Sequence, residues 1–164
     1  MEVLWAPWRM EYILSKKEDG CIFCRCASSS DLRSHLVLYK SEHCFVVMNR
    51  YPYNNGHLMV APYRHTGLLE ALSPEEAQDI MWVLQRCIQI LKEAFSPDGF
   101  NLGANLGKVA GAGVADHLHF HIVPRWEGDT NYMPVIGSTR VIPEHLERTY
   151  ERLWPLFQRR RDGR

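Results

Sequence analysis

The sequence predicts an α+β fold: a mainly antiparallel sheet of about five strands, with one long helix packed on it and a C-terminal helix. Two observations predict it. Short apolar runs bounded by turn residues lie on both sides of one long amphipathic segment. The glycine-rich stretch 103–113 has neither the Rossmann nor the P-loop spacing, which argues against a doubly wound fold. The chain of 164 residues fits a single domain over 1–164.

Three strands are expected before the long segment, at 35–41, 44–49 and 56–62. Each is a short apolar run, and the third is bounded by glycine and proline. The residues "YPYNNG" between the last two runs are typical of a turn. The first half of the chain therefore predicts adjacent antiparallel strands.

The long helix is expected to begin after Ser73, which can cap it, with Pro74 at the first helical position and Glu76 completing a capping box. Apolar residues then recur at helical spacing and predict a face that packs on the sheet. They are Ala77, Ile80, Met81, Leu84, Ile88, Leu91 and Phe95.

The second half of the chain predicts two more strands and a last helix. A turn at 97–99 leads into a strand at 100–107, and a histidine-rich strand runs over 117–123 until Pro124 ends it. The last helix is expected over 143–157, with an interruption near Pro155.

Charge and composition restrict the classes of function. Lys plus Arg and Asp plus Glu both number 19, so the chain has no basic excess to bind nucleic acid or an anionic membrane. The start "MEVLWAPWRM" lacks the features of a signal peptide, and no segment reaches membrane-spanning length. We expect a cytoplasmic protein whose substrate is a small molecule.

Three histidines at alternate positions carry the strongest functional signal. Side chains alternate along a strand, so His117, His119 and His121 are expected on one exposed face. The apolar residues between them are expected to pack under a helix. One alternative is a catalytic zinc held by all three imidazoles, but a straight strand spreads them over about 13 Å, too far to reach one ion.

Five cysteines, three of them in "CIFCRC", argue against a disulfide framework. Cys21 and Cys24 have C-x-x-C spacing, which is half of a zinc site. Two further ligands are required, and Cys26, His43 or Cys44 could supply one of them.

The run from His117 to Val123 resembles the signature of the histidine triad (HIT) family of nucleotidyl hydrolases and transferases. The stretches "VVMNRYPYNNGHLMVAPYRH", "SPEEAQDI" and "FNLGANLG" also resemble that family in order and spacing. The segments "LWAPWRMEYI" and "PRWEGDTN" resemble the bacterial diadenosine tetraphosphate phosphorylase branch, with fragile-histidine-triad-like hydrolases as further relatives.

The resemblance implies the catalytic residues. His119 would attack the α-phosphorus of a nucleotide and form a nucleotidyl-histidine intermediate, and His121 would contact the phosphate oxygens or the leaving group. Asn49 would hold the ribose hydroxyls. The nucleotide and phosphate contacts that the resemblance implies are Asn49, His57, Asn105, Gly111, Gly113 and His121. Gly113 is a departure, because many relatives have Ser or Gln at this position.

The resemblance also implies a structural zinc ion, bound by Cys21, Cys24, His65 and His117. The domain would comprise a zinc-associated N-terminal segment, about 1–30, and a C-terminal extension, about 125–164. The chain would form a homodimer or a higher homo-oligomer.

The implied activity is cleavage of dinucleoside polyphosphates, with inorganic phosphate as the expected acceptor. Arg125 and Lys108 are candidates for holding that second anion. The alternatives are hydrolysis of nucleoside phosphoramidates or other nucleotides, or nucleotide binding with little turnover.

Overall fold

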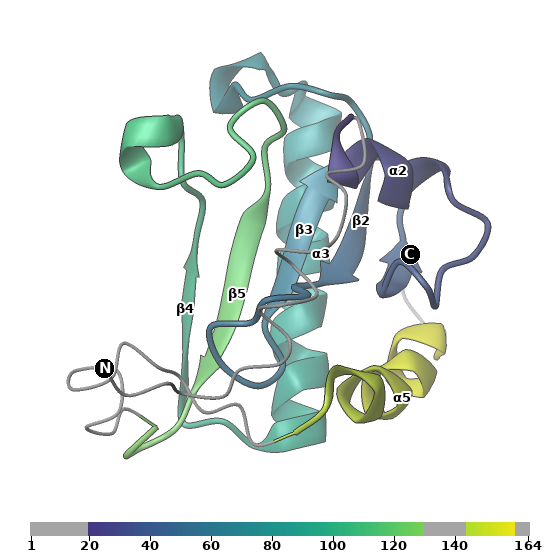
Figure 1. The fold of residues 1–164 in the computed structure, drawn as a ribbon, viewed down its shortest axis with the longest axis vertical. Helices are drawn as coiled ribbons and strands as arrows, with labels where there is room; N and C mark the ends of the chain where they lie inside the picture. The colour runs from purple at the N-terminus through teal and green to yellow at the C-terminus, as the bar shows by residue number, and fades with distance from the viewer. Residues whose placement is uncertain (1–19, 130–143, 160–164) are drawn as a thin grey trace, which may run out of the picture.

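The computed structural model describes residues 20–129 and 144–159 (Figure 1). The opening segment 1–19 and, in the C-terminal extension, residues 130–143 and 160–164 lie outside these ranges. The elements, in chain order, are α2 (Ile22–Ser28), β1 (Val37–Lys40), β2 (Cys44–Met48), β3 (Leu58–Pro62), the 3-10 turn η1 (Leu69–Ala71), α3 (Pro74–Phe95), β4 (Gly99–Gly103), the 3-10 turn η2 (Lys108–Ala110), β5 (Phe120–Arg125) and α5 (Leu146–Gln158).

The five strands form one sheet in the order β1-β2-β3-β5-β4, and every neighbouring pair is antiparallel. This confirms the predicted α+β class. The long helix α3 packs against β2, β3 and β5, and α5 packs against β1 and α3. The short helix α2 lies at the other face of the sheet, near the end of β3 (Figure 1), and Phe23 of this helix contacts the segment that leads into β5.

The two faces of the sheet have separate apolar cores. The larger core joins the sheet to α3 and α5, and includes Leu58, Val60 and Ile122 from the central strands. The smaller core lies on the opposite face, where Phe23 of α2 packs on Phe45 and its neighbours. Because side chains alternate along a strand, the residues between the helix-facing positions of β3 and β5 point into this second face, which carries the histidines.

The start of α3 follows the sequence prediction. The Ser73 hydroxyl accepts from the backbone N–H of Glu76, and the Glu76 carboxylate accepts from the backbone N–H of Ser73, which completes the capping box. The predicted apolar face needs correction, because Met81 is 55% exposed and Ala77 is exposed as well. The apolar residues of α3 cover a wide arc of the helix. The buried stripe is rotated from the predicted face and also includes Val83, Cys87, Ile90 and Ala94.

Strand β5 contains Pro124, which does not end it. The Pro124 carbonyl accepts from Asn54 on the side where β3 has not yet begun, while the register pairs Pro124 with Phe100 of β4 on the other side. The N–H that proline lacks would point to the same side as its carbonyl, so no bond of the sheet is lost. Strand β4 is shorter than expected and ends at Gly103.

Helix α5 runs through Pro155 without the expected interruption. Leu153 and Phe157 are buried on both sides of the proline and hold the last turn against α3. The buried guanidinium of Arg86 donates to the carbonyls of Phe157 and Arg159, at 2.7 and 3.0 Å. These charge-assisted bonds cap the carboxyl end of α5 and offset the hydrogen bond that Pro155 removes.

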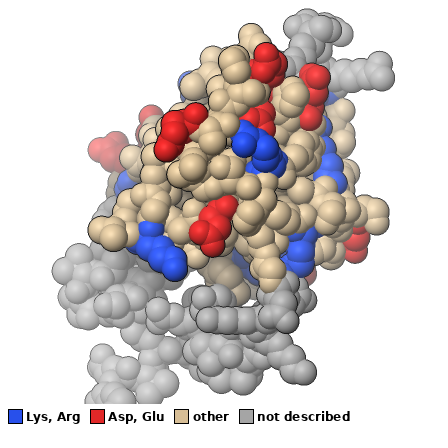
Figure 2. All heavy atoms as spheres, turned by 90° about the horizontal axis from the view of Figure 1, so that it is seen from above, with Lys and Arg blue, Asp and Glu red and all other residues tan. Residues whose placement is uncertain are grey.

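The surface seen from above the sheet carries Lys, Arg, Asp and Glu side chains of both signs, interspersed among neutral residues (Figure 2). This agrees with the zero formal charge. Among the residues that the structure describes, no helix is both long and apolar enough to cross a membrane.

Candidate functional site

The histidine row lies at the beginning of β5 rather than inside one strand. Only His121 is a strand residue, and it pairs with Met59 of β3 and Gly103 of β4. His117 and His119 come before the strand, where the N–H of Leu118 donates to the carbonyl of Thr66 at 2.6 Å. This bond draws the chain away from the sheet and explains why β5 begins later than predicted.

The expectation of an exposed row is wrong for two of the three histidines. His117 is 0% and His119 is 5% exposed. The ring of Phe23 covers both, with ring centroids 5.2 Å from that of His117 and 4.6 Å from that of His119. A helix before the sheet therefore closes over the row, which the alternation of residues in the strand could not reveal.

The hydrogen bond of His119 fixes its tautomer. Its Nδ1 lies 2.8 Å from the carbonyl oxygen of His117, and a carbonyl only accepts, so Nδ1 carries the proton. Nε2 then carries a lone pair. Among the described residues, no hydrogen bond engages this Nε2. Burial lowers the pKa of His119, which favours the neutral, nucleophilic ring.

A second chain of bonds fixes the tautomer of His121. The backbone N–H of Tyr53 donates to Nδ1 of His57 at 3.0 Å, so the proton of His57 is on Nε2. That Nε2–H donates to Nδ1 of His121 at 2.9 Å, which leaves an N–H donor at Nε2 of His121. Burial, and then the neighbouring His119, lower the pKa of His121 to about 4. His121 is therefore a neutral donor near pH 7.

His57, for which the resemblance implied a nucleotide contact, is 1% exposed, and both of its ring nitrogens are engaged. Its Nε2–H holds the ring of His121 in place. Asn49 lies beside it, with Nδ2 3.4 Å from Nδ1 of His57. The Asn49 side-chain oxygen accepts from the N–H of Tyr51 at 2.9 Å, so this residue shapes the turn before β3.

The glycine-rich loop between β4 and β5 brings Asn105 and Gly111 together, since Nδ2 of Asn105 donates to the Gly111 carbonyl at 3.4 Å. Gly111 has a φ of 89°, a left-handed conformation that favours glycine. Gly113 is exposed, and a Cβ atom built on it would meet nothing within 4 Å. The loop thus has space for a larger residue at this position.

Four potential metal ligands converge beside the histidine row, and we call them the Cys₂His₂ cluster: Cys21, Cys24, His65 and His117. Their ligand atoms all lie within 4.8 Å of one another. Nδ1 of His117 is 3.3 Å from Sγ of Cys21 and 3.3 Å from Nδ1 of His65. Sγ of Cys24 is 3.3 Å from Nδ1 of His65 and 3.6 Å from Nδ1 of His117. These are the four residues that the family resemblance implied.

The protonation of this cluster fits a metal ion. Nε2 of His117 lies 2.9 Å from the Pro62 carbonyl and must donate to it, so the lone pair on Nδ1 points at the two sulfur atoms and at His65. Edges of 3.3–3.6 Å are those of a tetrahedron with ligand distances of about 2.0–2.3 Å. Burial and the adjacent Cys21 raise the pKa of Cys24, and a divalent cation would reverse that effect.

The alternative ligands lie elsewhere. Cys26 is buried with its Sγ 3.9 Å from the His35 carbonyl, and Cys44 donates to the Asp79 carboxylate. A catalytic metal bound by the whole row is also excluded by the geometry. Each histidine of the row directs its Nδ1 to a different partner, so the three imidazoles do not converge on one point.

Arg125, a candidate for a second anion site, is already engaged. Its Nε and Nη2 bind the two carboxylate oxygens of Asp129 at 2.6 and 2.7 Å, and Nη1 donates to Asn101 at 2.8 Å. It stands four residues beyond His121, about 13 Å along an extended strand. Lys108, in the glycine-rich loop, is exposed and is the better candidate.

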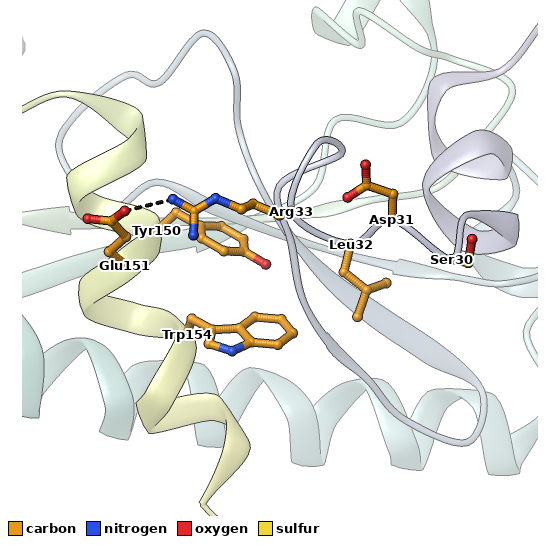
Figure 3. Close-up of a pocket in the computed structure, with 7 residues that line it drawn as sticks. All are labelled: Ser30, Asp31, Leu32, Arg33, Tyr150, Glu151 and Trp154. Carbon is orange, nitrogen blue, oxygen red and sulfur yellow. Dashed lines mark hydrogen bonds and ion pairs between the residues drawn. The ribbon is translucent and has the colours of Figure 1, made fainter.

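A pocket of about 520 Å³ lies between α5 and the segment after α2, away from the histidines (Figure 3). Its walls are Ser30, Asp31, Leu32, Arg33, Tyr150, Glu151 and Trp154. Arg33 donates to Glu151 at 2.6 Å, so its charge is already paired. None of the lining residues is a nucleophile positioned by a base, and we place the functional site at the histidine row instead.

Sequence reasoning missed two parts of this site, the ring of Phe23 and the carbonyl of Pro62. The first had a weak signal, because Phe23 stands between the two cysteines in "CIFC". The second had none, since a backbone carbonyl leaves no trace in the residue type.

Comparison with known proteins gives consistent results. A profile of the HIT domain matches residues 33–128. The chain is 40% identical over 158 residues to an AP-4-A phosphorylase from Mycobacterium tuberculosis, covering 91% of this chain and 80% of the relative. It is 31% identical over 134 residues to a bis(5'-adenosyl)-triphosphatase from Dictyostelium discoideum, covering 77% and 89%.

Among solved structures, a Zn-bound histidine triad family protein from Mycobacterium smegmatis superposes with a TM-score of 0.66 at 28% identity. The alignment covers 84% of this chain and 93% of that protein.

Proposed function

This chain belongs to the HIT domain family, and from that premise we propose that it is an enzyme that cleaves dinucleoside polyphosphates of the diadenosine tetraphosphate type. The observation that carries the proposal is the bond from Nδ1–H of His119 to the His117 carbonyl, which leaves the Nε2 lone pair free to attack phosphorus. The relatives named for AP-4-A phosphorylase and bis(5'-adenosyl)-triphosphatase activities support the substrate class.

In the first step, Nε2 of His119 forms a bond to the α-phosphorus, the bond to the bridging oxygen breaks, and a nucleoside triphosphate leaves with the bonding pair. The Nε2–H of His121 donates to a phosphate oxygen and stabilises the charge that develops there. We assign Asn105 and the glycine-rich loop with Gly111 and Gly113 to the phosphate groups, and Asn49 to the ribose.

In the second step, an oxygen of inorganic phosphate attacks the adenylyl group on His119 and releases the imidazole. Diadenosine tetraphosphate and phosphate then yield ATP and ADP. Lys108 is the cation that we assign to the incoming phosphate, because Arg125 is bound to Asp129.

We further propose that the Cys₂His₂ cluster binds a structural zinc ion. The convergent ligand atoms and the zinc-bound Mycobacterium smegmatis relative support this assignment. Zinc would supply a tetrahedral link between α2 and the chain before β5, with all four positions taken by side chains and none left for substrate.

The proposal extends to the whole chain. We propose one domain over residues 1–164, because α2 and α5, which flank the HIT region, pack on the two cores of the same sheet. A cytoplasmic location is supported by free thiols at all five cysteines. A homodimer is supported by exposed apolar residues along the edge strand β4 and the loop after it.

The test is turnover of diadenosine tetraphosphate with labelled inorganic phosphate. We expect label in ADP, unlabelled ATP, and a rate that rises with phosphate concentration until saturation. AMP plus ATP, with no incorporation of label, would make the protein a hydrolase. Binding without turnover, or turnover of adenosine phosphoramidates alone, would reject the dinucleotide proposal.

A further inference from the structure

The short helix α2 connects the Cys₂His₂ cluster to the reactive histidine. Cys21 is its N-cap, Cys24 lies in its first turn, and Phe23 directly precedes Cys24. Phe23 is 2% exposed and its ring packs against both His117 and His119. The same turn of helix therefore supplies two ligands of the cluster and the surface on which the nucleophile rests.

Helix α2 has little local support. It has seven residues, its N-cap makes no side-chain hydrogen bond, and its first turn contains no acidic residue. Helices of this length do not persist in water without tertiary contacts. The cluster and the small core around Phe23 must hold α2 in place, so the position of the Phe23 ring depends on both.

The ring of His119 has few other constraints. Its Nδ1–H binds the His117 carbonyl, and the ring of His121 meets it edge-on with centroids 4.9 Å apart. One hydrogen bond leaves the imidazole free to turn about that axis. The ring of Phe23, 4.6 Å away and inclined by 31°, covers one side and blocks that rotation.

We propose that Phe23 is a positioning residue for His119, and that the Cys₂His₂ cluster acts on the nucleophile by holding Phe23 in place. The ring keeps the Nε2 lone pair in one direction and keeps water from competing for Nδ1–H. The expected effect on kcat rests on the proposed function. The expected effect on the orientation of the His119 ring does not.

The test compares Phe23→Leu with Phe45→Leu in the metal-loaded full chain. Both residues are buried in the same small core, but Phe45 stacks on Tyr63 and, among the described residues, makes no ring contact with a histidine. We expect Phe23→Leu to lower kcat about tenfold or more with KM changed by less than about twofold, because the attacking atom is displaced. Phe45→Leu should lower the melting temperature comparably and leave kcat within about twofold.

A second readout follows the ring itself. In protein with ¹⁵N-labelled histidine, His119 should show one tautomer, with its proton on Nδ1, in the wild type and in Phe45→Leu. We expect a mixture of tautomers in Phe23→Leu and after metal removal by a chelator. A single tautomer and an unchanged kcat in Phe23→Leu would overturn the proposal, as would equal kcat losses in the two variants. If the wild type turns over no dinucleotide, the proposed function fails, and the tautomer spectra alone decide this inference.

Discussion

Each histidine of the row has one ring nitrogen committed to a different partner. His117 binds the Pro62 carbonyl, His119 binds the His117 carbonyl, and His121 accepts from His57. The remaining nitrogens are therefore available for the roles that we propose, which are, in chain order, metal ligand, nucleophile and hydrogen-bond donor. Alternation in "HLHFH" predicted that the three would act together, but it does not specify their separate partners, which are two backbone carbonyls and the side chain of His57.

The partly buried, neutral state of His121 has a consequence for stability. Its pKa is about 4 in the folded protein and about 6.5 when unfolded, so the unfolded chain takes up the proton first as the pH falls. Stability is then lost between about pH 6.5 and pH 4. We expect His121→Gln to make the fall in melting temperature across this range shallower, as measured by calorimetry. His145→Gln, at an exposed position before α5, is the control and should reproduce the wild-type slope. An unchanged slope in His121→Gln would contradict the assignment.

At the scale of secondary structure, features set by local hydrogen bonds were easier to predict than features set by contacts between distant residues. The capping box at Ser73 fixes the beginning of α3, because both of its hydrogen bonds are local. The start of β5 depends on a bond from Leu118 to Thr66, and the passage of α5 through Pro155 depends on Arg86. These two contacts join residues far apart in the sequence, so local patterns could not show them.

Helix α2 should depend on the metal cluster. Cys24→Ser removes one ligand, and we expect the variant to lose about one metal ion per chain and to melt at a lower temperature. Cys26→Ala is the matched control, because Cys26 lies in the same helix outside the cluster. Elemental analysis should find the metal retained in Cys26→Ala. Metal retained in Cys24→Ser would show that the ligand set is wrong.

The connection after β3 touches the loop that leads into the histidine row. A Cβ atom on Gly67 would overlap the carbonyl oxygen of Ala115, so only glycine permits this approach. We expect Gly67→Ala to cost about 1–3 kcal/mol of stability and to lower activity, because the backbone at 115–116 must move. Gly99→Ala, where a Cβ atom meets nothing within 4 Å, should lower neither. Chemical denaturation and turnover measure the two effects, and equal stability losses would contradict the argument.

On the scale of the whole molecule, the sheet has different partners on its two faces. One face is covered by α3 and α5 and gives the molecule its main core, while the other carries the histidines under α2. The layers followed from the order of apolar runs and the long helix in the sequence. The covering of the row by Phe23 did not, because nothing local to "CIFC" indicates where its side chain docks.

The edge strand β4 and the following loop expose Leu102 and Leu106, each 47% accessible, and Val109. If this edge pairs two copies of the chain, Leu102→Lys combined with Leu106→Lys should give a monomer in light scattering. Met81→Lys, on an equally exposed apolar site of α3, should not change the mass. A monomeric wild type, or a dimer that persists in the double variant, would rule out this interface.

The central claim is that Nε2 of His119 becomes covalently bound to the nucleotide. The most direct measurement is mass spectrometry of the protein quenched in the first turnover with diadenosine tetraphosphate, followed by mapping of the modified peptide. The account predicts one adenylyl group on His119, absent in His119→Ala and still present, though formed more slowly, in His121→Ala. An adduct on another residue, or one that persists in His119→Ala, would contradict it.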